Sequence, residues 1–150
     1  MAYITTTQLS ARLGSTLYAR LTDRVNGASA DSAVAQQIVD EAEGVANSYL
    51  SRRYATPIDL TAHPELAGTL EARMLDLAES IAWRSSPFVT DVPDRIRFLF
   101  EDAERWLERV ASGRLNLPAD SPPASRTAED DGPRFEAGGR AFTGDELDGL

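Results

Sequence analysis

The sequence predicts an all-α fold, a small bundle of two short and three long helices with an extended, largely irregular C-terminal arm. Three segments of about twenty residues carry apolar side chains at steps of three and four, the spacing of one helical face. No strand pattern of useful length is present. Beyond residue 117 the chain turns to Pro, Ser, Gly, Asp and Glu, a composition that cannot bury enough apolar surface to offset the entropy of ordering.

Two short helices are predicted in the N-terminal part. Thr6 or Thr7 can cap the first, which ends near Gly14. The second ends before a turn at Asn26 and Gly27. The apolar residues of the two helices are Leu9, Leu13, Leu17, Tyr18 and Leu21.

Three long helices follow, within residues 31–54, 64–83 and 93–113. Asp31 can cap the first, Pro64 and Pro93 suit the first turns of the others, and Gly113 suits a left-handed stop. Burying their stripes against one another favours a bundle. The stripes are Val34, Ile38, Ala42, Val45 and Tyr49; Leu66, Leu70, Met74, Leu77 and Ile81; and Ile96, Leu99, Ala103, Leu107 and Val110.

This pattern divides the chain into a helical core, residues 1–117, and an arm, residues 118–150. The core holds 16 acids and 12 bases and the arm 8 acids and 3 bases, so the net charge of -9 is shared as -4 and -5. All the bases are arginine, which we attribute to a GC-rich genome rather than to interfaces. The arm ends on residues 141–150, where Phe142, Leu147 and Leu150 stand among acids. We predict that this end is a docking segment, the alternative being a tail without a function.

Composition excludes several classes of protein. There is no cysteine, which excludes disulfides and thiolate metal sites. The opening residues do not predict a signal peptide, and no apolar run predicts a membrane span. A net acidic chain has no general attraction for DNA phosphates.

No motif predicts catalysis, a cofactor or a metal. His63, the one histidine, is interpreted as a helix-start residue beside Pro64, because no motif supplies a nucleophile or an orienting group. The loop from Asp23 to Asp31 lacks the alternating acids and the final glutamate of a calcium loop. Phosphate-binding glycine loops and the GxSxG motif are absent from the sequence. We therefore expect a protein that is not an enzyme.

Four residues are candidates for an interface with another subunit or a partner protein. Phe98 and Trp106 flank the third stripe, where they either widen the core or form a second face for a partner. Arg52 and Arg53 follow the first long helix, where positive charge suits the helix dipole and can also bind a partner.

Several blocks occur in a characteristic order: YITTTQLSARLG, LYARLTDRVNG, ANSYLSRRYATPI, PELAGTLEARMLDLAESIAW, FLFEDAERWLERVASGRLNL and RAFTGDELDGL. With them the chain resembles the small head–tail connector proteins of tailed bacteriophages, in particular the Mu-like connector family long catalogued as a domain of unknown function. It departs from that pattern in the loop VNGASAD, which has few acids, and in having Trp83 as the sole aromatic at the end of its helix.

The resemblance implies an adaptor subunit that forms a ring, a dodecamer, beneath the portal in the neck of the virion. Its implied partners are the portal protein, a tail-side connector or tail terminator protein, and its own copies, assembled in the host cytoplasm without a membrane. DNA passes through the channel without specific binding. The alternatives are an acidic DNA mimic or regulatory protein of phage origin, suggested by the acidity, and a small hydrolase that uses His63.

Overall fold

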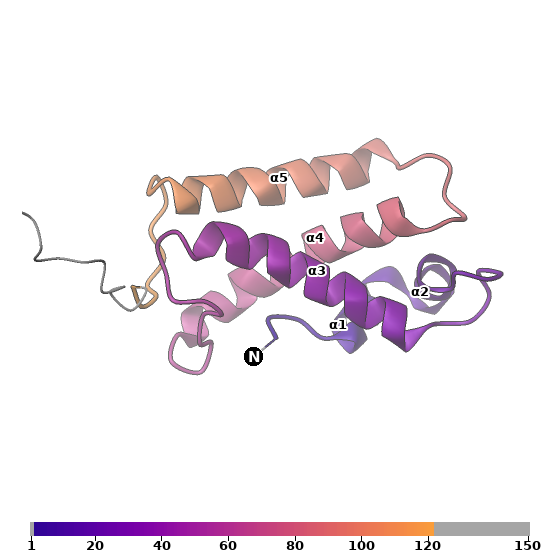
Figure 1. Ribbon diagram of the computed structural model, residues 1–150, viewed down its shortest axis with the longest axis horizontal. Helices are drawn as coiled ribbons and strands as arrows, with labels where there is room; N and C mark the ends of the chain where they lie inside the picture. The colour runs from indigo at the N-terminus through magenta and orange to yellow at the C-terminus, as the bar shows by residue number, and fades with distance from the viewer. Residues whose placement is uncertain (1, 122–150) are drawn as a thin grey trace, which may run out of the picture.

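The computed structural model describes residues 2–121, which form five α-helices and one short 3-10 turn (Figure 1). No strand occurs among these residues, so the predicted all-α fold is confirmed. None of the helices described is long and apolar enough to cross a membrane. The elements are α1 (Thr6–Leu13), α2 (Ser15–Thr22), α3 (Ser32–Leu50), η1 (Pro64–Leu66), α4 (Ala67–Ser85) and α5 (Asp94–Ala111).

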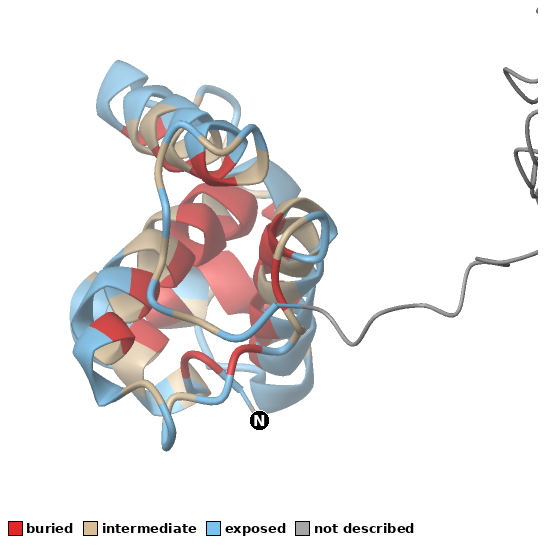
Figure 2. Ribbon diagram, turned by 90° about the vertical axis from the view of Figure 1, so that its left-hand side faces the viewer, coloured by how far each residue is buried: buried red, intermediate tan, exposed pale blue. Residues whose placement is uncertain are grey.

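Helix α4 is the centre of the bundle and contacts each of the other four α-helices. Buried residues lie along the inner faces of the helices (Figure 2). On α4 the buried face includes Leu70, Met74, Leu77 and Ile81, and Leu66 of η1 continues it, so the predicted stripe is confirmed. Burial of such side chains contributes about 1.5–3 kcal/mol each, which makes this stripe a main source of stability.

Helix α3 buries a face rotated from the predicted one. Val34, Val45 and Tyr49 are only partly buried. The side chains fully inside are Ala35, Ile38, Val39, Ala42, Ala46 and Leu50. Small alanines let two helix backbones approach closely, and α3 uses three of them where it packs on α4 and α5. The prediction placed too much weight on the larger apolar side chains.

Helix α3 also ends earlier than predicted, at Leu50, because Tyr54 leaves the helix to become buried. The hydroxyl of Tyr54 accepts the backbone N–H of Leu117 at 2.8 Å. From the other side, the hydroxyl of Tyr3 accepts the N–H of Ile58 at 2.8 Å. Two tyrosines far apart in the chain thus hold the linker between α3 and η1.

Residues at its two ends determine where helix α1 begins and ends. Thr5, rather than Thr6 or Thr7, caps α1: its hydroxyl accepts the N–H of Gln8 at 3.2 Å, and the Gln8 side chain accepts the N–H of Thr5 at 2.8 Å. This reciprocal pair is a capping box. Gly14 ends α1 as predicted, with φ of 78°, a value in which glycine has no Cβ penalty.

The later helix ends agree with the sequence in most respects. Asp31 caps α3 as predicted. Pro64 opens the 3-10 turn η1 that leads into α4, whereas Pro93 is the cap of α5 and not a first-turn residue. Gly113 has φ of 78° and provides the predicted left-handed stop. On α5, Leu99 is partly buried while the rest of its stripe is buried.

After α5 the chain returns along the linker between α3 and η1. Leu115, Leu117 and Ala119 pack against the core, and the N–H of Ala55 donates to the carbonyl of Asp120 at 2.9 Å. The described chain therefore remains attached to the helical body as far as Asp120. The division of the chain at residue 117 stays a prediction.

Candidate functional site

The four predicted interface residues lie in different environments. Phe98, on α5, is 65% exposed, and it and Val25, 86% exposed, are the exposed large hydrophobic residues of the described chain. Trp106 is partly buried against the core, and the Arg73 guanidinium lies 5.9 Å from its ring centre. Phe98 is thus exposed on the surface of α5, whereas Trp106 is used largely within the fold.

Arg52 and Arg53 follow α3 directly, as the sequence indicates. Arg52 is exposed, with its guanidinium 5.6 Å from the ring centre of Tyr49. Arg53 is partly buried and its guanidinium lies against Gly113. The pair therefore stands beside the stop of α5. The predicted docking residues Phe142, Leu147 and Leu150 lie outside the described residues.

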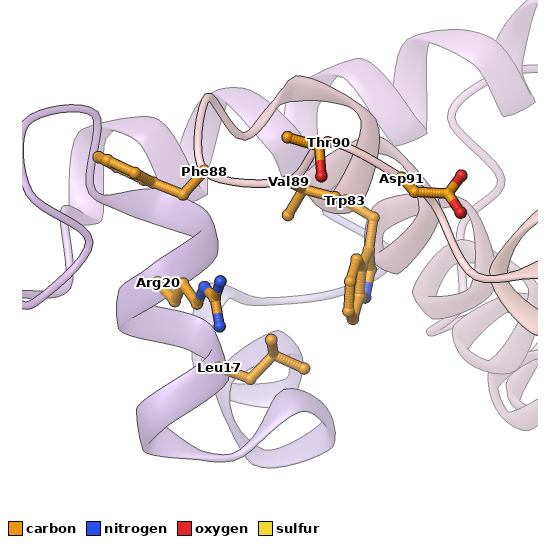
Figure 3. Close-up of a pocket in the computed structure, with 7 residues that line it drawn as sticks. All are labelled: Leu17, Arg20, Trp83, Phe88, Val89, Thr90 and Asp91. Atoms are coloured by element: carbon orange, nitrogen blue, oxygen red, sulfur yellow. The ribbon is translucent and has the colours of Figure 1, made fainter.

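A pocket of about 190 Å³ lies between α2 and the loop that joins α4 to α5 (Figure 3). Leu17 and Arg20 of α2 face Trp83 of α4 across it. The Trp83 indole N–H is buried and has no acceptor among the described residues, although a buried indole N–H usually finds one. The remaining wall is formed by the loop residues Phe88, Val89, Thr90 and Asp91.

A second pocket, of about 200 Å³, lies between α4 and α5 and is mainly apolar, with Val92, Ile96 and Phe100 in its wall. Arg84 closes one side, its guanidinium 4.2 Å from the ring centre of Phe100. That arginine is already engaged with an aromatic face, a favourable cation–π arrangement. The first pocket is therefore the more open to a charged partner.

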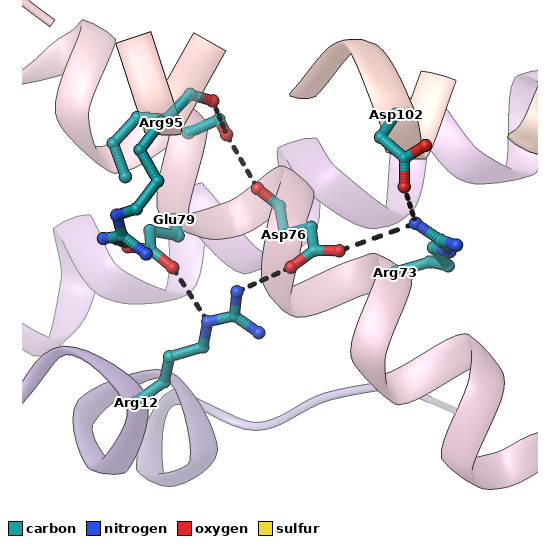
Figure 4. A network of polar contacts seen from close by, with 8 residues as sticks. Arg12, Arg73, Asp76, Glu79, Arg95 and Asp102 are labelled. Atoms are coloured by element: carbon teal, nitrogen blue, oxygen red, sulfur yellow. Dashed lines mark hydrogen bonds and ion pairs between the residues drawn. The ribbon is translucent and has the colours of Figure 1, made fainter. Parts of the chain in front are cut away.

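A network of ion pairs holds α1 and α5 against α4 (Figure 4). Glu79, only 3% exposed, accepts from Arg12 at 2.8 Å and from Arg95 at 3.1 Å. Arg12 also reaches Asp76 at 2.6 Å, and Arg73 reaches Asp102 of α5 at 2.5 Å. The carboxylates of Asp76 and Glu79 are occupied by arginines, so this cluster acts as a clamp between helices.

The loop after α2 is closed around one carboxylate. Asp23 accepts the N–H groups of Val25 at 2.8 Å, of Ala28 at 3.0 Å and of Ser29 at 3.1 Å. These donors, with Val25 first, hold the pKa of Asp23 well below its usual range. The part of the chain that is described holds no group of three or more acidic or histidine side chains placed to bind a metal ion. Asp23 therefore organises a turn.

His63 lies at the start of η1, as interpreted from the sequence. Its Nδ1 is 3.6 Å from Glu65 and its Nε2 is 3.4 Å from Asp120. Glu65 belongs to η1 itself, so the Asp120 contact is the one that reaches the segment following α5, and His63 Nε2 has no hydrogen-bond partner among the described residues. The expectation that the protein is not an enzyme stays a prediction.

The five helices fall within a single family match. Residues 3–136 match the family described as Bacteriophage Mu, Gp36. The chain belongs to this family. No curated protein matches the chain. The resemblance seen in the sequence is thereby confirmed as far as a Mu-type phage protein, with all five helices inside the matched range.

Sequence reasoning did not locate the pocket in Figure 3. The sequence shows Trp83 as the sole aromatic at the end of its helix, and the predicted helix ranges 64–83 and 93–113 imply a connection between the two helices. Neither observation places the two beside Arg20, because that contact depends on how α2 packs against α4. A residue that is both large and off the stripe was the available signal.

Proposed function

We propose that the chain is a head–tail connector subunit, a structural protein of a phage virion that forms a ring beneath the portal and joins capsid to tail. The observation that carries the proposal is the match to the Bacteriophage Mu, Gp36 family over residues 3–136. Such a subunit extends the DNA channel from the capsid. Its partners are the portal protein, a tail-side connector or tail terminator protein, and its own copies in a dodecamer.

The described surface suits a ring. A closed ring needs two different contact surfaces on each copy, since every subunit meets one neighbour with each. The exposed Phe98 of α5 and the pocket between α2 and the α4–α5 loop are candidates for such surfaces. A buried aromatic anchor in a partner's pocket is a common centre of binding energy.

The net charge of -9 suits a channel through which DNA must pass without being held. Negative side chains repel phosphates and leave no counterions to be released on binding, so the wall does not retain DNA. The same acidity favours a second candidate, a DNA mimic or regulatory protein of phage origin. The two candidates differ in the proteins that they bind.

The test is to tag the full chain in cells that produce the particle and to identify co-purifying proteins by mass spectrometry. If the chain is a connector in the virion neck, we expect portal, capsid and tail proteins to co-purify with it. Recovery of a nuclease, repressor or polymerase without particle proteins would refute it and favour the mimic.

Two variants sharpen this test. Phe98→Asp alters an exposed side chain, so we expect the folded protein to persist while recovery of partners falls at least tenfold. Arg105→Glu, an exposed residue on the same helix, is the matched control and should recover partners as the wild type does. Equal recovery by both variants would remove Phe98 from the interface.

A further inference from the structure

The pocket between α2 and the α4–α5 loop and the sequence of residues 141–150 have complementary chemistry. We propose that Phe142 of one copy docks in this pocket on a neighbouring copy, with the acids that follow it paired to Arg20. The proposal rests on the ring arrangement of the proposed function. It names the receptor for a segment that the sequence marks as a docking end.

The first argument is size and polarity. Leu17, Val89 and the indole ring of Trp83 supply apolar wall (Figure 3). A dry apolar cavity of about 150 Å³ is enough to hold a benzene molecule, and this pocket has about 190 Å³. One phenyl ring therefore fits it. Phe142 is the one aromatic residue of the docking segment.

The second argument is charge. Arg20 lies in the pocket wall, and none of the acids in residues 2–121 forms an ion pair with it. Asp91, the acid in the same wall, is already paired with Arg97 at 3.2 Å. The docking segment places Asp145 and Glu146 three and four residues after its phenylalanine. A carboxylate is the ligand that a guanidinium binds best.

The third argument is the unsatisfied indole. The N–H of Trp83 is buried without an acceptor in the described part of the chain. A buried donor left unpaired costs about 1–3 kcal/mol. A peptide entering the pocket brings carbonyl and carboxylate oxygens, the acceptors that an indole N–H needs.

The fourth argument is position. The described chain ends near the C-terminal end of α5, whereas α2 lies at the opposite end of the molecule (Figure 1). Donor and receptor at opposite ends give the head-to-tail contact that a ring requires. Nineteen residues, the number from 122 to 140, reach at most about 65 Å when fully extended, which is more than the roughly 27 Å length of an 18-residue helix such as α5. A neighbour's pocket is within that reach.

The test is disulfide trapping on the full chain, which contains no cysteine of its own. One chain carries Thr90→Cys at the pocket, and a second, size-tagged chain carries Ala141→Cys beside Phe142. We expect their mixed disulfide to form at least ten times faster than that of a control pair in which Ser48→Cys, exposed on α3, replaces Thr90→Cys. Equal rates for the two pairs would overturn the proposal.

Charge reversal makes the test specific. Adding Arg20→Glu to the Thr90→Cys chain should slow trapping at least tenfold, while Arg105→Glu should leave the rate within twofold. An unchanged rate with Arg20→Glu overturns the proposed recognition. A chain carrying both cysteines should link to other copies, so rapid trapping within single chains, independent of protein concentration, would overturn docking on a neighbour.

Failure of this proposal is distinct from failure of the proposed function. If trapping fails while the tagged chain still recovers portal and tail proteins, the connector role stands and the receptor is wrong. If trapping succeeds without recovery of particle proteins, the copies associate through this contact but the connector role is wrong.

Discussion

Replacing Glu79 with Gln tests whether the clamp in Figure 4 stabilises the bundle. The change keeps the size of the side chain and removes its charge. The Arg12 side chain is 28% exposed and loses one of its two carboxylates, whereas the Arg95 side chain is 69% exposed and returns to water at little cost. A hydrogen bond to a charged group contributes about 1.5–3 kcal/mol and an exposed ion pair about 0–1 kcal/mol.

We therefore expect Glu79→Gln to lower the free energy of unfolding by about 2–3 kcal/mol. At about 3 °C per kcal/mol for a chain of this size, the Tm should fall by about 6–9 °C. Far-UV circular dichroism during heating and in urea measures both quantities. The matched control is Glu71→Gln, partly buried on the same helix and without an ion pair in the described chain. It should change stability by less than about 0.5 kcal/mol. If the two variants lose the same free energy of unfolding, or if Glu79→Gln loses none, the ion pairs of Glu79 do not stabilise the bundle.

Three further predictions concern stability. Met74→Ala empties a fully buried site in the centre of α4 and should cost about 2–5 kcal/mol, measured by urea unfolding. Gly113→Ala should destabilise by about 1 kcal/mol or more, because φ is positive and the Arg53 guanidinium occupies the space, whereas Gly44→Ala, open and inside α3, should stabilise by about 0.4–1 kcal/mol. The backbone donors that lower the pKa of Asp23 contribute stability above about pH 4 that is lost as the pH falls below it, so unfolding measured at pH 6 and pH 3 should change less in Asp23→Asn than in the wild type. Parallel pH dependences would contradict this origin.

The features that the sequence predicted correctly are those set by neighbouring residues. Gly14 and Gly113 end helices because few other residues adopt their backbone angles, and Asp31 caps α3 with its own side chain. The stripe of α4 is correct because this helix is covered on most sides by other helices. Large apolar residues of the α4 stripe therefore become buried against a neighbouring helix.

The features that the sequence missed depend on distant contacts. Whether Ala46 or Val45 faces inward on α3 is decided by how closely α4 and α5 approach, which no local pattern reports. In the sequence Tyr54 is the last residue of the predicted helix. Its place outside the helix depends on the hydrogen bond that its hydroxyl accepts from the backbone N–H of Leu117, which no local pattern reports.

The candidate site shows the same division. The sequence left open whether Phe98 widens the core or forms a second face, and the structure shows it exposed. It grouped Trp106 with Phe98, although Trp106 packs against the core beneath Arg73. Eight residues separate the two, which puts them about 80° apart on a helical wheel with Trp106 nearer the stripe, so the wheel alone already indicates the difference. The pocket beside Arg20 forms where α2, the end of α4 and the α4–α5 loop come together. The sequence of each element alone therefore does not indicate it.

The attachment of residues 114–121 to the linker between α3 and η1 has a mechanical consequence. Tension applied beyond residue 121 is received by the Ala55–Asp120 and Tyr54–Leu117 hydrogen bonds before it reaches the last turn of α5. The force is then shared between the end of α5 and the linker that follows α3. It therefore does not act on the end of α5 alone. A molecule pulled beyond residue 121 should break these two hydrogen bonds first and extend by the length of residues 114–121, while the helical bundle remains intact.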